Sequence, residues 1–127
     1  MRPLAFVDLE TTGATASNDR ITEIGIIEVD TDGSVREWQQ LVNPGVRISP
    51  FIEQLTGISN AMVATAPDAD TVMRDASRFV GNAPMVAHNA SFDRRFWQAE
   101  LARAGATAAQ PFACTMLVSR RLYPQAS

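Results

Sequence analysis

Several kinds of residue and segment are scarce in this chain, and each absence excludes a class of protein. There is one cysteine among 127 residues, so the chain cannot form an intramolecular disulfide or a multi-cysteine zinc site. No apolar run approaches the roughly 20 residues that cross a bilayer, and the N-terminus has no signal-peptide core. We therefore expect a cytoplasmic protein that does not contact a membrane.

Positive charge is also scarce. The formal net charge is −3, and all eleven basic residues are arginine. A domain that binds nucleic acid over a broad phosphate-contacting surface usually has a high pI, so this charge argues mildly against such a domain. It does not argue against an enzyme that holds phosphate through divalent metals, because such an enzyme needs local carboxylates that lower its net charge.

The remaining composition is that of one globular domain. Hydrophobic residues make up 46% of the chain and charged residues 20%, a balance that allows a buried core. The sequence contains no internal repeat, low-complexity segment or interdomain linker. We interpret residues 1–127 as a single α/β domain with a mixed sheet.

The first half of the sequence predicts three consecutive strands. Residues 4–10, 20–29 and 34–42 are rich in apolar or β-branched residues. The Asp32-Gly33 pair marks a turn between the last two of these segments. Strands joined in this way form an antiparallel meander.

The second half predicts alternating helices and strands. A short helix should begin at Ser49-Pro50 and stop at Gly57, and Gly81 stands where an amphipathic helix over residues 68–80 should end. The other expected elements are short strands at 84–87 and 112–114 and helices at 90–104 and 115–123. The expected fold is a three-strand meander followed by βα units, with helices flanking the sheet.

Two carboxylates stand at the end of the first strand. Residues two apart on a strand share a face, so Asp8 and Glu10 lie in one row that begins with Phe6. Taken alone, the pair could simply begin a polar loop. However, two carboxylates at a strand's carboxyl end repel each other unless a cation bridges them, and the Thr-Thr-Gly turn at residues 11–13 could approach a ligand closely. Magnesium or manganese would suit such oxygen ligands.

A third carboxylate, Asp93, lies near the start of the helix expected after the fourth strand. By itself it could be a first-turn acid that complements the helix dipole. Both acidic positions follow short apolar strands, however, and neighbouring strands would bring Asp93 close to Asp8 and Glu10. Glu23, inside the second strand, could be a satisfied acid within the sheet or a group that supports the site, and the sequence leaves both interpretations open.

The only histidine, His88, stands at the junction between the fourth strand and the next helix and is followed by Asn89. Its ring could act as a base, as a metal ligand or as a hydrogen-bonding element of the turn. We favour the last interpretation, because a histidine at a strand-to-helix junction often orients the loop.

Several segments together resemble the DnaQ-like 3′-to-5′ exonucleases of the DEDDh type, a family with a ribonuclease H-like fold. Residues 6–13 (FVDLETTG) are similar to the first exonuclease motif, and residues 86–93 (VAHNASFD) to the second. Residues 21–25, 41–44 and 55–58 are similar to the family's second strand, its third strand and the short helix that borders its substrate groove. Several spaced motifs in the expected order are far more specific than any one of them.

The resemblance implies an enzyme that uses two magnesium or manganese ions to hydrolyse the last phosphodiester of DNA or RNA. Asp8 would be the ligand shared by both ions, with Glu10 holding the first and Asp93 the second. The family's general base is a histidine of the third motif. His88 and Asn89 would therefore support the site rather than act on the substrate.

The resemblance also implies how a single-stranded 3′ end is held. Leu9 and Thr11 would lie near the terminal nucleotide. Phe92 would lie close to its sugar or base, and Leu55 belongs to the helix that borders the groove. Such contacts measure the strand end rather than read its sequence, because stacking and phosphate contacts tolerate any base.

One part of the family pattern has no counterpart. Residues 114–117 and 120–124 are similar to the segment that precedes the third motif, but the histidine and aspartate of that motif do not follow Pro124. We therefore expect a C-terminally truncated exonuclease domain that lacks its last helix, binds metal weakly and has little or no turnover. The loss would also expose apolar surface, so that two copies could associate.

Other functions stay open from the sequence. The chain could be a polymerase proofreading subunit, with a DNA polymerase subunit as its partner, or a free-standing enzyme that trims DNA or RNA. It could also be a noncatalytic nucleic-acid-binding or scaffold protein, although clustered acids without a metal destabilise a fold. A magnesium-dependent phosphohydrolase of small nucleotides is the third alternative, and it would cleave mononucleotide esters instead of oligonucleotides.

Overall fold

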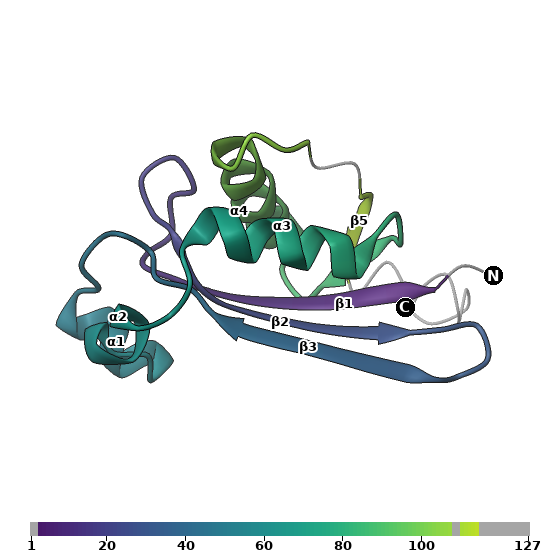
Figure 1. Cartoon of the computed structure of the whole chain (residues 1–127), viewed down its shortest axis with the longest axis horizontal. Helices are drawn as coiled ribbons and strands as arrows, with labels where there is room; N and C mark the ends of the chain where they lie inside the picture. Colours follow the sequence, from purple (N-terminus) through teal and green to yellow (C-terminus); the bar gives the residue numbers. More distant parts are fainter. Residues whose placement is uncertain (1–2, 108–109, 115–127) are drawn as a thin grey trace, which may run out of the picture.

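A mixed five-stranded sheet forms the centre of the computed structural model, which describes residues 3–107 and 110–114. The strands are β1 (Leu4–Thr11), β2 (Ile21–Val29), β3 (Val35–Leu41), β4 (Met85–Ala87) and β5 (Phe112–Cys114). The helices are α1 (Pro50–Thr56), α2 (Asn60–Ala64), α3 (Ala69–Val80) and α4 (Ala90–Arg103). In space the strand order is β3-β2-β1-β4-β5 (Figure 1).

The first three strands form the antiparallel meander that the sequence predicts. Pairing between β1 and β2 is regular from Leu4 opposite Val29 to Glu10 opposite Glu23. The register then shifts between Glu10 and Thr11. Such irregularities end regular pairing and bend a strand, and they are common beside active sites.

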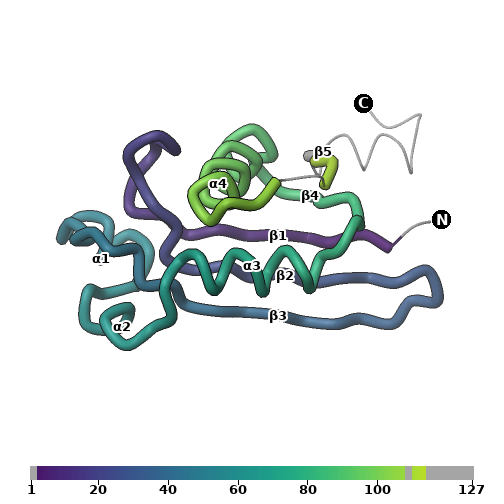
Figure 2. The backbone as a smooth tube through the Cα atoms, turned by 45° about the horizontal axis from the view of Figure 1, so that its top comes forward, coloured from purple at the N-terminus to yellow at the C-terminus, as the bar shows by residue number. Residues whose placement is uncertain are grey.

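The two short strands extend the sheet in the parallel direction. β4 pairs with β1, and β5 pairs with β4. Parallel neighbours need a crossover connection, which α4 provides between β4 and β5. Figure 2 shows that β1 and β4 run side by side in the same direction, with β4 beside the first half of β1 and α1 at the end where the chain leaves β1.

The helix boundaries follow the predicted caps. The Ser49 side chain accepts a hydrogen bond from the Ile52 backbone N–H, and Gly57 ends α1 with a φ of 76°, a left-handed conformation that favours glycine. The Asp68 side chain caps α3 in the same way. The sequence interpretation missed α2, although Ser59 caps it and gave a local signal for it.

The two longer helices, α3 and α4, lie on one side of the sheet (Figure 1). Ala5, Val7 and Leu9 of β1 point into the core that these helices cover, which also contains the fully buried Phe96 and Trp97. The alternate residues of β1 are less buried and face the other side. The acidic row therefore lies on the face away from α3.

A second, smaller core supports the segment that contains α1 and α2. Its buried members are Ile48, Ile58 and Val63, and Ile52 of α1 packs against them. The expected helix at residues 115–123, and the absence of a later one, lie outside the residues that the structure describes. Within the described part of the chain, none of the helices combines the length and the apolar character that a membrane span requires.

Candidate active site

Asp8 and Glu10 lie at the C-terminal end of β1, on the sheet face opposite to α3 and α4. Asp8 is exposed and Glu10 is half-buried, whereas Leu9 between them is buried in the core. The residue opposite Asp8 on β2 is Gly25, which has no side chain. A hollow of about 330 Å³ lies here, and both Asp8 and Gly25 line it. The carboxylate of Asp8 is therefore accessible to a ligand.

Glu10 lies in a cluster of like charge. Burial raises the pKa of the Glu10 carboxyl above its usual value, and the negative charges of Asp8 and Glu23 raise it further. Glu23 stands directly opposite Glu10 on β2 and accepts a hydrogen bond from Gln39 Nε2 at 3.1 Å. Glu23 is thus both a hydrogen-bonded acid within the sheet and an electrostatic neighbour of Glu10.

Asp93 approaches the same cluster from the first turn of α4. Its side chain is buried, and burial is the main reason why its pKa rises to about 6. The Asp8 charge raises this pKa as well, with a smaller contribution from Glu10, while the Asn89 backbone and His88 lower it. The structure therefore brings Asp8, Glu10 and Asp93 within electrostatic reach of one another. The pairing of β1 with β4 is the reason, because α4 follows β4 directly.

The chemistry of these three side chains fits a divalent metal. The charge of Asp8 raises the pKa of Glu10 and of Asp93, so these two groups are disfavoured as anions, and a bound cation would relieve that repulsion. Their oxygen atoms are the ligands that magnesium and manganese prefer. In the described residues, no three histidine, cysteine, aspartate or glutamate side chains yet lie close enough to hold one ion. Binding would therefore require Asp8, Glu10 and Asp93 to move toward one another.

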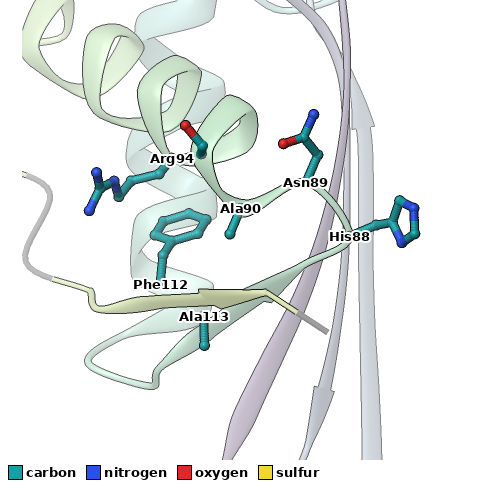
Figure 3. A pocket seen from close by; sticks show the side chains of 7 residues that line it. His88, Asn89, Ala90, Arg94, Phe112 and Ala113 are labelled. Atoms are coloured by element: carbon teal, nitrogen blue, oxygen red, sulfur yellow. The ribbon is translucent and has the colours of Figure 1, made fainter. Parts of the chain in front are cut away.

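His88 and Asn89 lie at the turn between β4 and α4. The His88 ring is exposed and points away from the other labelled side chains in Figure 3, which shows a hollow of about 390 Å³ at this turn. Within the described ranges the ring has no hydrogen-bond partner, so the expected hydrogen bonding within the turn is not seen. Asn89 occupies the N-cap position of α4, but its side chain makes no capping hydrogen bond.

A separate hollow of about 400 Å³ lies beside the acidic pair. All four residues predicted to contact a substrate line it: Leu9, Thr11, Leu55 and Phe92. They come from β1, α1 and α4, three elements that are distant in sequence. Glu10, Gly13, Ala14, Phe51, Ile52 and Thr56 also line this hollow, which we call the β1–α1 hollow.

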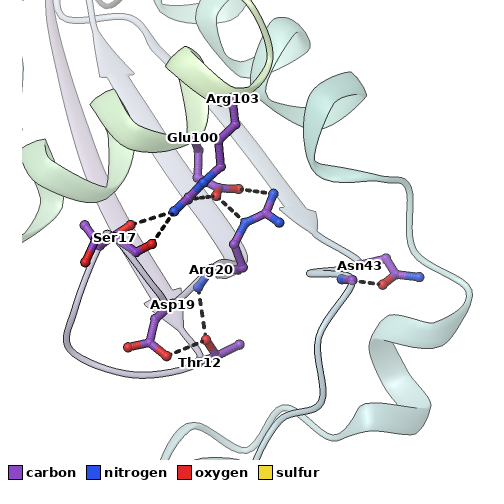
Figure 4. A network of polar contacts seen from close by, with 9 residues as sticks. Thr12, Ser17, Asp19, Arg20, Asn43, Glu100 and Arg103 are labelled. Carbon is purple, nitrogen blue, oxygen red and sulfur yellow. Dashed lines mark hydrogen bonds and ion pairs between the residues drawn. The ribbon is translucent and has the colours of Figure 1, made fainter.

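A buried ion-pair network holds the loop between β1 and β2, and the sequence interpretation missed it (Figure 4). The Glu100 side chain of α4 is 0% exposed and accepts hydrogen bonds at 2.5 Å from Arg20 Nε and from Arg103 Nη1. Arg103 Nη2 also donates to the carbonyl oxygens of Ala16 at 2.8 Å and Ser17 at 3.3 Å. We call Glu100, Arg20 and Arg103 the loop clamp.

The same loop is also held from inside. Asp19 accepts hydrogen bonds from Thr12 Oγ1 at 3.2 Å and from the Thr15 backbone N–H at 3.0 Å. A Cβ atom at Gly13 would lie 2.5 Å from the Asp19 carboxylate, so a larger residue here would force the Asp19 side chain to move. Gly13 and Ala14 of this loop line the β1–α1 hollow, and the loop clamp holds the same loop two residues further on, at Ala16 and Ser17.

Comparison with known proteins agrees with the motifs. A profile of the exonuclease family matches residues 5–127. Over 123 residues the chain is 45% identical to a protein of Mycobacterium tuberculosis (strain CDC 1551 / Oshkosh) that is named a putative bifunctional exonuclease/endonuclease. The matched region covers 91% of this chain and 19% of that protein. It is 38% identical over 94 residues to DNA polymerase III subunit epsilon of Treponema pallidum (strain Nichols), covering 74% of this chain and 44% of that protein.

The fold is also that of a known nuclease. The structure of Escherichia coli exonuclease I in complex with a dT13 oligonucleotide superposes with a TM-score of 0.79 and 16% sequence identity, covering 98% of this chain and 31% of that one. This likeness shows a ribonuclease H-like fold, as the motifs predicted. The chain spans less than half the length of each of these proteins. The chain belongs to the DnaQ-like exonuclease family.

Proposed function

We propose that this chain carries the catalytic site of a divalent-metal-dependent exonuclease that removes nucleotides one at a time from the 3′ end of a single strand. The observation that carries the proposal is the meeting of Asp8, Glu10 and Asp93 beside the β1–α1 hollow in a member of the exonuclease family. The carboxylates supply a place for metal and phosphate, and the hollow supplies a place for the terminal nucleotide.

Asp8, Glu10 and Asp93 would hold the metal ions. Bound divalent ions would lower the pKa of a coordinated water, so that it could act as the nucleophile at neutral pH, and would neutralise charge on the leaving oxygen. Asp8 is the exposed member of the three and reaches Glu10 and Asp93 electrostatically, which supports its role as the shared ligand. Because the pKa of Asp93 rises to about 6 without metal, metal binding near or below pH 6 would release a proton from this group.

The residues of the hollow would orient the terminal nucleotide. Leu9 and Phe92 offer apolar contacts to its base and sugar, and Leu55 closes the opposite wall on α1. The Thr11 hydroxyl donates a hydrogen bond to the Gly13 carbonyl at 2.6 Å, which holds the end of β1 in place. None of these contacts distinguishes one base from another, so trimming would be independent of sequence.

The 127-residue chain offers, among its described residues, no side chain that is well placed to act as the general base. Its only histidine is His88, which is exposed and turned away from the labelled residues of the neighbouring hollow. We therefore expect little turnover from the 127-residue chain alone. A product extended by the downstream codons of its gene, if these encode the family's third motif, would supply the histidine and a fourth carboxylate.

The names of the similar proteins suggest which molecules this chain binds. The name of the Treponema relative is that of a DNA polymerase III subunit, and the superposed nuclease was solved with an oligonucleotide. By analogy, single-stranded DNA or RNA would be the substrate, and a polymerase subunit is a candidate partner.

The proposal is tested by incubating 5′-labelled single-stranded DNA, and in parallel RNA, with magnesium and either the 127-residue chain or the extended product. We expect the extended product to give a ladder that shortens by single nucleotides from the 3′ end, with much slower shortening by the short chain. Asp8→Ala should abolish it. If neither product shortens DNA or RNA, or if Asp8→Ala shortens it as well as the parent, the proposal is wrong.

The same assay separates the alternatives. Cleavage of mononucleotide esters without oligonucleotide shortening would point to a small-nucleotide phosphohydrolase. Binding of oligonucleotides without cleavage by either product would point to a noncatalytic nucleic-acid-binding protein.

A further inference from the structure

A strongly exposed phenylalanine, Phe51, lies on the wall of the β1–α1 hollow. It is 71% exposed, and Leu55, one turn later in α1, is 68% exposed. Residues four apart share a helix face, so α1 presents an apolar face to the hollow. Large apolar side chains are normally buried, and a pair of them at the edge of a hollow indicates a surface that contacts a ligand.

Phe51 is not needed to attach α1 to the rest of the molecule. Ile52 packs against the smaller core, while Ser49 and Gly57 cap the two ends of the helix. The Glu53 carboxylate adds a hydrogen bond from the Asn60 backbone N–H at 2.7 Å. The Phe51 ring is therefore placed by a helix that other residues hold.

We infer that Phe51 stacks on the base next to the terminal nucleotide of the bound strand. This inference rests on the proposed function. Phe51 lines the same hollow as Leu9, Thr11 and Phe92, and at 71% exposed it is the most solvent-exposed large apolar residue of its lining. An exposed ring at this edge meets the next unit of the strand.

The chemistry of stacking explains why such a contact suits any strand. Every base has a flat aromatic face, so a phenylalanine ring binds any base with similar strength. Phe51 would thus add affinity for the strand without reading its sequence.

The inference is tested by binding. Fluorescence anisotropy in magnesium measures the affinity of the 127-residue chain for a short 5′-labelled oligothymidylate, with a gel to verify that the oligonucleotide stays intact. Competition with thymidine 5′-monophosphate measures the terminal subsite alone. We expect Phe51→Ala to weaken oligothymidylate binding about tenfold, because stacking on an aromatic side chain contributes on this scale. Binding of the monophosphate should change less than about twofold.

Two further variants at the same position separate stacking from simple apolar contact. Phe51→Trp should bind oligothymidylate as tightly as the parent, because tryptophan also stacks, whereas Phe51→Leu should bind it as weakly as Phe51→Ala. Val35→Ala, at a 55% exposed apolar residue of β3 outside the hollow, is the matched control and should bind like the parent. Circular dichroism verifies that each variant is folded.

The outcomes distinguish the inference from the proposed function. Equal oligothymidylate binding by the parent and Phe51→Ala overturns the inference and leaves the proposed function standing. So does equal loss of oligothymidylate and monophosphate binding, or full rescue by Phe51→Leu. If the parent binds neither ligand, or if Asp8→Ala binds both as well as the parent, the proposed function is contradicted and the inference falls with it.

Discussion

At the scale of single residues, the site is defined by how differently its three carboxylates are placed. Asp8 is exposed on the open face of the sheet, Glu10 is half-buried, and Asp93 is buried in the first turn of α4. The pKa of Asp93 rises to about 6 mainly because of burial. Without metal, this carboxylate therefore opposes folding at neutral pH.

Asp93→Asn should reveal this effect as a change of stability with pH. The usual aspartate pKa is about 3.9, so between about pH 4 and pH 6 the folded chain binds more protons at this site than the unfolded chain. Its stability therefore falls as pH rises through this range and stays lower above it. Urea unfolding in EDTA should find the variant more stable than the parent by roughly 1–2 kcal/mol at pH 7.5, with no gain at pH 4.

Magnesium provides the internal control for this experiment. At pH 7.5, added magnesium should stabilise the parent, since an ion that binds only the folded state favours folding, and should stabilise Asp93→Asn less. Equal stability of the two proteins in EDTA at pH 7.5 would show that the Asp93 charge is not destabilised by its surroundings.

At the scale of elements, the loop between β1 and β2 is fixed by α4. Glu100 contributes a fully buried carboxylate, and Arg20 and Arg103 neutralise it from the strand start and from its own helix. A buried charge that loses its partner is costly, whereas an exposed pair contributes little. The wall of the β1–α1 hollow therefore depends on one side chain that does not line it.

Glu100→Gln should lower the free energy of unfolding by roughly 1–3 kcal/mol, because it leaves two partly exposed arginines without their common carboxylate. Asp75→Asn is the matched control, since it breaks the exposed pair with Arg78 and should cost less than about 1 kcal/mol. Urea unfolding followed by circular dichroism measures both. A similar decrease in the free energy of unfolding for the two variants would mean that the buried loop clamp stabilises the fold no more than an exposed ion pair.

At the scale of the whole molecule, the described sheet has two unlike faces. The two longer helices cover one face, while the other carries the exposed apolar residues Ile27 and Val35. Such a surface favours self-association.

Sedimentation velocity over a range of concentrations should therefore show a dimer. The double variant Ile27→Thr/Val35→Thr should weaken this dimer, whereas Val46→Thr, at an exposed residue elsewhere, should not. A monomer at every concentration would contradict this prediction.

Much of the fold could be predicted from local signals. The alternation of apolar residues gave the strands, and Ser49, Gly57 and Gly81 gave helix ends. We predicted that β1 and β4 are neighbours because acidic residues lie at the end of β1 and shortly after β4. The parallel pairing of the two strands confirms this prediction. The loop clamp could not be predicted, because Glu100 lies 80 positions from Arg20 and only the packing of α4 against the loop brings them together.

The site shows the same division between local and tertiary information. Motif spacing was enough to select Asp8, Glu10 and Asp93, whereas the contribution of Phe51 was missed because its exposure depends on where α1 sits relative to the sheet. Nothing in the sequence around Phe51 distinguishes a side chain that fills a core from one that faces a ligand.

If the three carboxylates act as one metal site, calorimetric titration with manganese at pH 7.5 should detect it in the folded chain. The parent chain should bind manganese saturably, and Asp8→Ala, Glu10→Ala and Asp93→Ala should each weaken binding about tenfold or more, as expected when a charged ligand is removed. Asp70→Ala, at an exposed acid of α3, should bind like the parent. No binding by the parent, or equal binding by all four variants, would show that Asp8, Glu10 and Asp93 do not form one metal site.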